Sequence, residues 1–385
     1  MPTKNAVVRK IKPVQHSSVS FNDKFWSKRI ETNRTKTIPA VYDNCKNSGR
    51  INAWRIDWKP GKKNTPHHFW DSDVAKWMEA AAYSLATHPD KVLERQLKSL
   101  TKLISSAQMQ DGYLNSYYQS VDIANRWTNL RDMHELYCAG HLIEAAVAFK
   151  ETTGDNQFLD TLIRYVKHID SQFGNEPGKK PGYPGHQEIE LALIKLYRLR
   201  KDKKHLDLAT YFIDERGKDP KYFDVEAKLR GATKPLAPET FKQLQAHLPV
   251  REMRTAEGHA VRACYLYSAM VDVATETGDK TLLTVSEQIW KNITERRMYI
   301  TGGVGSDPMG ERFSYDYDLP NETAYAETCA NISLVFFAHR LLQVNPKSEY
   351  ADVMERALYN SVISGVSLDG TKFFYENPLA ARNSS

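Results

Sequence analysis

The sequence Glu151-Thr-Thr-Gly-Asp155 ends one stretch of helical periodicity and begins another, and Glu276-Thr-Gly-Asp279 does the same later in the chain. Glycine ends helices readily because it adopts left-handed backbone angles, and aspartate caps the free amide groups at the start of the next helix. Each sequence therefore predicts a tight turn between two antiparallel helices. Related junctions occur at residues 88–90, 200–202 and 345–347.

Outward from these turns, the chain divides into pairs of helices. We expect five pairs and one N-terminal helix at 22–47; the pairs cover residues 73–108, 132–172, 186–216, 257–297 and 323–366. Self-similarity with a period of roughly 50 to 70 residues indicates a repeat architecture, in which each pair stacks on its neighbours. The long connections at 217–256 and 298–322 are where functional loops are expected.

The first helix of each pair opens with polar residues that helix packing does not require. These openings are Trp70-Asp-Ser-Asp73, Arg131-Asp-Met-His-Glu135, Gly185-His-Gln-Glu188, Glu257-Gly-His259 and Tyr325-Ala-Glu-Thr-Cys329. A closed ring of pairs would gather them in one polar pocket, suited to a ligand with many hydroxyls. Any one opening could instead cap its own helix, which is the favoured interpretation for Asp73.

We therefore predict an all-α fold of the (α/α)6 toroid type. The toroid is expected to be incomplete, with about five helix pairs plus the N-terminal helix. Short β segments are expected in loops and near the C-terminus.

Composition excludes several classes of protein. The net charge of +6 comes from 53 basic and 47 acidic residues that are interspersed, so the sequence lacks the basic stripe of a nucleic-acid-binding protein. No apolar segment is long enough to span a membrane. The polar stretch Met1–Pro13 lacks the apolar core of a secretory signal, which predicts a cytoplasmic protein. Four cysteines are too few for a disulfide framework.

The loop 301–320 is the first candidate for chemistry, because it is rich in glycine and carboxylates. Glycoside hydrolysis needs a group that protonates the leaving oxygen. Glu311, which follows Gly310, is a candidate for this group, and the aspartates at 307, 316 and 318 compete with it.

Other side chains suggest metal or sugar contacts. Glu327 and Cys329 carry two zinc-ligand types, although such a pair also occurs by chance. His134, His186 and His259 could donate hydrogen bonds to hydroxyls or orient a carboxylate. Four residues are expected in the core instead: His141, Cys45, Cys138 and Cys264.

Several stretches resemble glycoside hydrolase family 127, whose founding activity is β-L-arabinofuranosidase. The resemblance runs in order over roughly 20–380 and is carried by Asp111-Gly-Tyr-Leu-Asn115, Leu130-Arg-Asp-Met-His-Glu-Leu-Tyr-Cys-Ala-Gly-His-Leu-Ile-Glu-Ala145, Gly185-His-Gln-Glu-Ile-Glu190, Gly258-His-Ala-Val-Arg262, Gly310-Glu311, Tyr317-Asp-Leu-Pro-Asn321, Ala326-Glu-Thr-Cys-Ala330 and Phe374-Tyr-Glu-Asn-Pro378.

The resemblance implies roles for particular residues. Glu311 matches the general acid/base of the family, and Glu327 and Cys329 match two of its four zinc ligands. The residues that match sugar-holding positions are His134, His186, His259 and Tyr375. In such enzymes a zinc-bound cysteine thiolate is the nucleophile, and it forms a thioglycosyl intermediate with retention of configuration.

The sequence departs from the family pattern at its end. The family has an adjacent Cys-Cys pair some tens of residues after the stretch that ends here at Pro378, whereas this sequence stops at Ser385. We expect residues 1–385 to form a single truncated catalytic domain, without the last inner helix and the β-sandwich. Zinc binding is then expected to be weak or absent, and hydrolysis impaired.

The leading hypothesis is a glycoside hydrolase that releases L-arabinofuranose, or a similar furanoid sugar, from plant glycans. Its partner would be a small-molecule or oligosaccharide substrate, and a homodimer is the candidate assembly. One alternative is a carbohydrate-binding protein or inactive fragment. Another is an α/α-toroid polysaccharide lyase or sugar epimerase, which would use histidine and tyrosine for proton transfer and need no cysteine.

Overall fold

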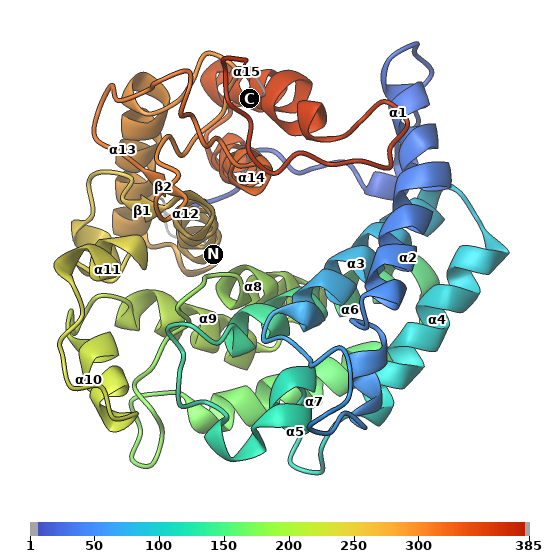
Figure 1. Cartoon of the computed structure of the whole chain (residues 1–385). Coiled ribbons are helices and arrows are strands. Elements are labelled where there is room, and N and C mark those ends of the chain that lie inside the picture. The colour runs from blue at the N-terminus through green and yellow to red at the C-terminus, as the bar shows by residue number, and fades with distance from the viewer. Residues whose placement is uncertain (1–6, 382–385) are drawn as a thin grey trace. The chain divides into compact units, whose positions relative to one another are not determined.

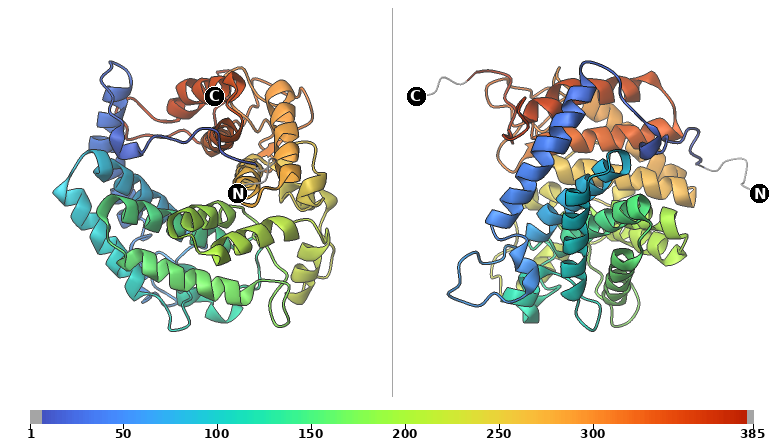
Figure 2. Two further views of the ribbon diagram at one scale, coloured as in Figure 1. Left: turned by 180° about the vertical axis from the view of Figure 1, so that it is seen from behind. Right: turned by 90° about the vertical axis from the view of Figure 1, so that its right-hand side faces the viewer.

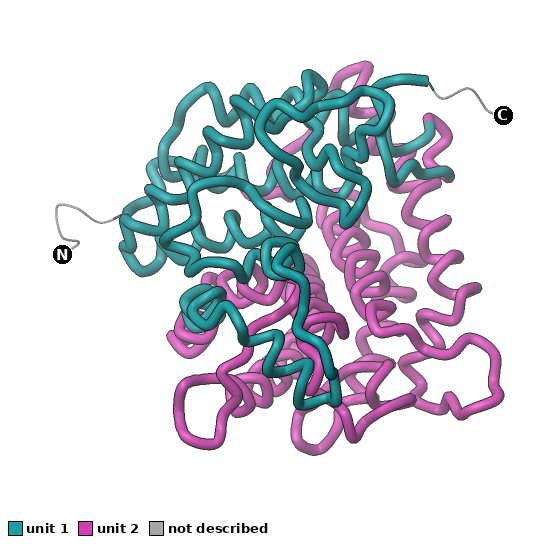
Figure 3. Tube along the Cα trace, turned by 60° about the vertical axis from the view of Figure 1, so that its left-hand side comes forward, with its two compact units in different colours: residues 1–13, 209–367, 372–385 teal, residues 14–208, 368–371 magenta. Residues whose placement is uncertain are grey.

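The computed structural model of the protein describes residues 7–381, so the first part of Met1–Pro13 lies outside it. The chain forms two compact units (Figure 3). Unit 1 consists of Met1–Pro13, Ala209–Ser367 and Lys372–Ser385, and unit 2 consists of Val14–Leu208 and Leu368–Thr371. The division falls within α9 (Lys203–Glu215).

Unit 2 is built from helices. Its α-helices are α1 (Trp26–Thr32), α2 (Ile38–Asn47), α3 (Trp70–Thr87), α4 (Lys91–Ser106), α5 (Ser116–Val121), α6 (Glu135–Thr153), α7 (Gln157–Gln172) and α8 (Ile189–Arg200). Short 3-10 helices add η1 (His16–Ser18), η3 (Asn52–Arg55) and η4 (Ile123–Asn125). The α6 helix packs against both α3 and α8, while α4 packs on α3 and α7 packs on α6 (Figure 1).

The helix expected at 22–47 is present as one continuous rod (Figure 2). The rod contains a π-helical turn, η2 (Asn33–Thr37), between α1 and α2. Pro39, in the first turn of α2, lacks an amide hydrogen and its ring crowds the preceding turn. A widened turn directly before a proline relieves that crowding, which gives a local reason for the π turn.

Unit 1 is also mostly helical. Its α-helices are α10 (Tyr222–Leu229), α11 (Pro238–Gln243), α12 (Ala260–Thr277), α13 (Lys280–Arg296), α14 (Thr328–Val344) and α15 (Ser348–Ala357). Further turns are η5 (Val250–Glu252), the π-helical η6 (Leu358–Val362) and η7 (Ile363–Gly365). The α12 helix packs against α13 and α14, and α14 packs on α15.

Two very short strands complete unit 1. The strand β1 (Gly258–His259) pairs antiparallel with β2 (Arg312–Phe313). In the register of this pair, His259 lies opposite Arg312. Short β segments in loops were expected and are confirmed; near the C-terminus the described residues contain only an isolated bridge between Val366 and Phe373.

The helices of the predicted pairs are present, and the predicted turn chemistry is confirmed at the glycines that end α6 and α12 and at the aspartate that caps α13. Gly154 and Gly278 end α6 and α12 with φ of 75° and 81°, in the left-handed region. Asp279 caps α13 by accepting hydrogen bonds from the amides of Thr281 (2.8 Å) and Leu282 (3.0 Å). Helical periodicity and capping residues thus locate these elements within a few residues.

The long connection predicted at 217–256 is wrong in detail, because it contains α10 and α11. These helices have 8 and 6 residues. Helices of about two turns are too short to display the repeating apolar pattern on which a helix prediction depends. Among the described residues, no helix has the length and apolar character required to cross a membrane.

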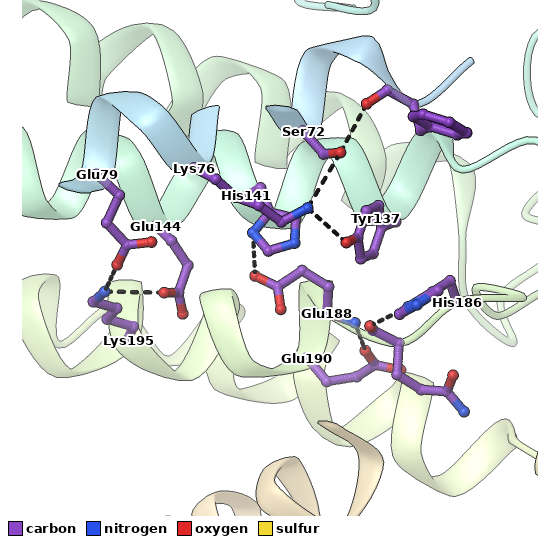
Figure 4. Close-up of polar contacts among 12 residues, drawn as sticks. Ser72, Lys76, Glu79, Tyr137, His141, Glu144, His186, Glu188, Glu190 and Lys195 are labelled. Carbon is purple, nitrogen blue, oxygen red and sulfur yellow. Dashed lines mark hydrogen bonds and ion pairs between the residues drawn. The ribbon is translucent and has the colours of Figure 1, made fainter. Parts of the chain in front are cut away.

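A lysine joins three helices of unit 2. Lys195 on α8 donates hydrogen bonds to the carboxylates of Glu79 on α3 (2.7 Å) and Glu144 on α6 (3.0 Å), as Figure 4 shows. It also donates to the hydroxyl of Tyr83 (2.8 Å). Burial and the neighbouring Glu144 raise the pKa of Glu79 to about 7, and the two glutamates raise the pKa of Lys195. The lysine therefore remains charged and separates two carboxylates that would otherwise repel each other.

Replacing this lysine by an apolar residue of similar length should destabilise unit 2. For Lys195→Met we expect the free energy of unfolding to fall by about 2–3 kcal/mol, because the partly buried carboxylates lose their counter-ion. Urea unfolding at pH 7 measures the change. Lys203→Met is the matched control, since the pair of Lys203 with Asp207 (2.7 Å) is exposed and should contribute less than about 1 kcal/mol. Equal losses in the two variants would contradict a stabilising role for Lys195.

Candidate active site

Glu311 is held in place by an unusual backbone turn in unit 1. It has a φ of 56°, and the preceding Gly310 has a φ of 86°. A non-glycine residue in this region is strained by roughly 1 kcal/mol or more and persists only where its surroundings fix it. Here the Glu311 carbonyl accepts a hydrogen bond from the amide of Ala260 (2.9 Å), and the side-chain amide of Gln243 donates to the Gly310 carbonyl.

The carboxylate of Glu311 lies between two side chains. The Tyr325 hydroxyl donates to its Oε1 (2.9 Å), and Nε2 of His259 lies 2.9 Å from its Oε2. Because Nδ1 of His259 accepts from the amide of Arg262 (3.4 Å), we assign the proton to Nε2, which then donates to Glu311. His259 is the N-cap residue of α12, and the start of this helix therefore fixes its position.

The electrostatics of this trio favour an ionised glutamate. The hydrogen bond from His259 is the largest influence that lowers the pKa of Glu311, and the Tyr325 hydroxyl lowers it further. Burial lowers the pKa of His259. At neutral pH the imidazole is therefore neutral, and Glu311 is a carboxylate that can accept a proton.

Glu327 lies next to this trio and is buried. Its carboxylate and the ligand atoms of His259 and Glu311 all lie within 4.8 Å of one another, which makes them a candidate metal group. Ala326, directly before it, has a φ of 39°. The buried Asn331 holds this turn, because its side-chain amide donates to the carbonyls of Ala326 and Ser361, each at 3.1 Å.

Tyr375 reaches the same region from the end of the described chain. The amide of Thr328 donates to the Tyr375 carbonyl (3.0 Å), and the side-chain amide of Asn377 donates to the Ala326 carbonyl (2.9 Å). Burial and then the nearby charge of Glu327 raise the pKa of the Tyr375 hydroxyl, with smaller effects from Cys329 and Glu311. Cys329 itself is exposed in the first turn of α14.

The two other predicted sugar-binding histidines lie together in unit 2. His134 precedes α6 and the buried His186 precedes α8, and their ring centroids are 5.7 Å apart. Tyr137 packs against His186 with a centroid distance of 4.3 Å, and His68 approaches His134 at 5.1 Å. His186 is labelled in Figure 4, as are the buried His141 and Glu188, whose Nδ1 and Oε1 atoms lie 3.3 Å apart.

The structure separates Glu311 from two of its competitors. Asp307 forms an ion pair with Arg312 (2.8 Å), and Asp316 forms one with Arg297 (2.7 Å). The arginines lower the pKa of Asp316 to about 2. Both aspartates are thus paired with arginine, whereas the Glu311 carboxylate accepts hydrogen bonds from the neutral side chains of Tyr325 and His259.

Sequence reasoning assigned no role to Tyr325, Asn331 or His68. Tyr325 is part of a polar opening that the sequence did reveal, so its hydroxyl was a detectable candidate. Asn331 follows Glu327 by four residues, a spacing that places both on one helix face. His141 is buried with a partner as expected, and Cys45, Cys138 and Cys264 are buried as expected.

Comparison with known proteins identifies the family. Residues 18–385 match the GH127 catalytic domain of β-L-arabinofuranosidases, so the chain belongs to this family. The non-reducing end β-L-arabinofuranosidase of Bifidobacterium longum is 44% identical over 318 residues, which cover 81% of this chain and 48% of that protein. The chain thus spans about half the length of this curated relative.

Solved structures agree with this assignment. A GH127 β-L-arabinofuranosidase from Geobacillus stearothermophilus T6 has a TM-score of 0.92 and 49% identity, covering 95% of this chain and 59% of that one. Another GH127 β-arabinofuranosidase has a TM-score of 0.87 and 40% identity, covering 97% and 57%. The resemblance found in the sequence motifs is therefore confirmed at the level of the family.

Removing Asn331 should loosen the turn that carries Glu327. In Asn331→Ala, three buried backbone partners lose hydrogen bonds: the carbonyls of Ala326 and Ser361, and the amide of Val304, which donates to Asn331 at 3.0 Å. We expect a loss of about 3 kcal/mol in the free energy of unfolding. Urea unfolding measures it against Asn360→Ala, whose single side-chain hydrogen bond (2.7 Å) is exposed. A loss no larger than in that control would show that Asn331 does not hold the turn.

Proposed function

We propose that this chain is the catalytic domain of a glycoside hydrolase that releases L-arabinofuranose or a similar furanoid sugar with retention of configuration. The observation that carries the proposal is the Glu311 carboxylate, held by His259 and Tyr325 within 4.8 Å of Glu327. A glycosidase needs such a positioned carboxyl group beside the bond that it breaks. The family membership supports the sugar class.

Glu311 is proposed to act as the general acid/base. The lowered pKa of Glu311 favours the carboxylate, so its protonated form is the minor one; that form would give its proton to the leaving oxygen. As that bond breaks, the anomeric carbon would bond to a cysteine thiolate, the nucleophile that the family resemblance implies. The Glu311 carboxylate would then accept a proton from water, whose oxygen displaces the thiolate from the anomeric carbon and gives retention. His259 and Tyr325 occupy its two oxygens and so orient the group. An acid/base that keeps one rotamer can meet the glycosidic oxygen with little reorganisation.

The remaining polar residues are proposed to hold the sugar. Tyr375, His134 and His186 carry groups that can exchange hydrogen bonds with hydroxyls, and the family resemblance implies this use for them. The same resemblance includes His259, whose two ring nitrogens contact Arg262 and Glu311, so its proposed part is to orient the acid/base. The stacking of the helix pairs in a toroid of the (α/α)6 type is part of the same proposal, and it rests on the repeated pairs and on the family.

Zinc is the metal that the family resemblance implies, and the donor chemistry of this chain fits part of a zinc site. Glu327 offers a buried carboxylate and Cys329 offers an exposed thiol two residues later. Both are zinc-ligand types, and structural zinc sites use four ligands. When bound, zinc would keep a coordinating thiol deprotonated at neutral pH.

The acid/base role predicts a substrate-dependent loss in Glu311→Gln. For an unactivated β-L-arabinofuranosyl disaccharide we expect kcat to fall by about 10²–10⁴-fold, because the leaving oxygen receives no proton. A p-nitrophenyl β-L-arabinofuranoside should lose less, since its leaving group needs little protonation. Arabinose release by chromatography measures both rates.

Asp318→Asn, in the same loop, is the control and should keep the parent rates. A disaccharide rate within about threefold of the parent would rule out the acid/base role of Glu311. Release of arabinose from neither substrate by the parent chain would contradict hydrolysis by this chain itself.

The metal assignment predicts that Cys329→Ala weakens zinc binding. We expect at least about a tenfold loss of affinity, because a thiolate ligand is removed. Elemental analysis after dialysis against zinc-buffered solutions measures the metal content. Cys45→Ala is the control, since burial raises the pKa of the Cys45 thiol to about 11 and disfavours the thiolate. Equal zinc content in the two variants would exclude Cys329 as a ligand.

A further inference from the structure

A cavity of about 310 Å³ lies in unit 1 beside the Glu311 turn. Its walls come from α11, from the paired strands β1 and β2, and from the loop after β2, which neighbour one another in Figure 1. The lining residues that matter here are Gln243, Glu257, Gly258, Arg312, Phe313 and Tyr315. The size is at the lower end for small-molecule sites, roughly 300 Å³, which suits a single ring.

The cavity and the Glu311 turn are built on the same backbone. Gly258 in the cavity wall directly precedes His259, and Arg312 in the wall directly follows Glu311. Gln243, also in the wall, donates to the carbonyl of Gly310. The cavity wall thus contains the sequence neighbours of His259 and Glu311, and it contains the side chain that holds the Gly310 carbonyl.

Glycine is required at position 258 for this arrangement. Gly258 has a φ of 72°, and a Cβ atom there would lie 2.1 Å from the carbonyl oxygen of Lys242. Any side chain would push the end of α11 away from β1. The close approach of these two elements thus fixes one wall of the cavity.

The charges in the wall largely cancel one another. Asp307 pairs with Arg312 (2.8 Å), and Glu257 lies 3.5 Å from Arg297, which also pairs with Asp316. The cavity offers many hydrogen-bonding groups but no excess of one sign. Such a lining favours a neutral polar ligand over an anion or a cation.

Aromatic side chains give the cavity an apolar surface. Phe313 is buried, while Tyr315 is 73% exposed. An exposed tyrosine ring beside polar groups can cover the apolar face of a sugar ring, while its hydroxyl remains available for hydrogen bonds. The combination of a neutral polar wall and an accessible ring matches the chemistry of an uncharged sugar.

We propose that this cavity is the subsite for the sugar on the leaving-group side of the scissile bond. The inference rests on the proposed function, in which Glu311 protonates the oxygen that joins the released furanose to the next sugar. That next sugar would carry the oxygen that Glu311 is proposed to protonate, and Arg312, the residue after Glu311, lines the cavity. Tyr315 is the residue that would stack on it.

Binding of two probes to the Glu311→Gln variant of the full 385-residue chain tests the proposal, because turnover of the disaccharide is expected to be about 10²–10⁴-fold slower in this background. The probes are methyl β-L-arabinofuranoside, which has no second sugar, and β-L-arabinofuranosyl-(1→2)-L-arabinose. We expect the disaccharide to bind at least about fivefold more tightly by titration calorimetry. Adding Tyr315→Ala should remove this advantage and leave the affinity for the methyl glycoside unchanged.

Tyr317→Ala is the matched control, since Tyr317 is 70% exposed in the same loop and does not line the cavity. It should keep the advantage of the disaccharide. Equal binding of the two probes, or an advantage that survives Tyr315→Ala, overturns the subsite while the proposed function stands. Binding of neither probe overturns the proposed function and the subsite with it.

Discussion

The pairing of β1 with β2 is the constraint on which the candidate site depends. It joins the start of α12 to a distant loop, and thereby sets His259 and Glu311 within hydrogen-bonding distance. Two paired residues on each side contribute little stability alone. They hold because Gly258 allows α11 to pack directly on β1, and because Gln243 fixes the carbonyl of Gly310.

Much of the fold could be predicted because helix starts and stops have local chemical causes. Gly278 ends α12 in a left-handed backbone conformation, and Asp279 caps the start of α13. Both roles agree with the prediction from the sequence. The helix α11 could not be found, since six residues carry no period. Short helices of this kind form because tertiary packing holds them, which a local pattern does not record.

Some residues of the candidate site could likewise be predicted from the sequence, and others could not. The residues of the glycine-rich loop made Glu311 one of four candidate carboxylates, and the family resemblance singled it out. Tyr325 stood in a polar opening, but the sequence did not show that its partner is Glu311 (2.9 Å). The role of Asn331 could not be predicted, since its side chain contacts Ser361, which is 30 residues away. The family resemblance implied roles for individual residues that composition could not indicate. A shared motif can include residues whose partners are distant in the sequence.

The π turn in the N-terminal rod has a consequence for how that rod packs. A π turn accommodates one more residue than an α turn, so the side chains after it are rotated by about 100° relative to a continuous α-helix. The apolar stripe of α2 is therefore out of phase with that of α1. This offset accompanies a clear difference between them: α2 buries Ile38 and Cys45, whereas α1 buries no residue. One inserted residue can thus change which side chains of a continuous helix face the protein core.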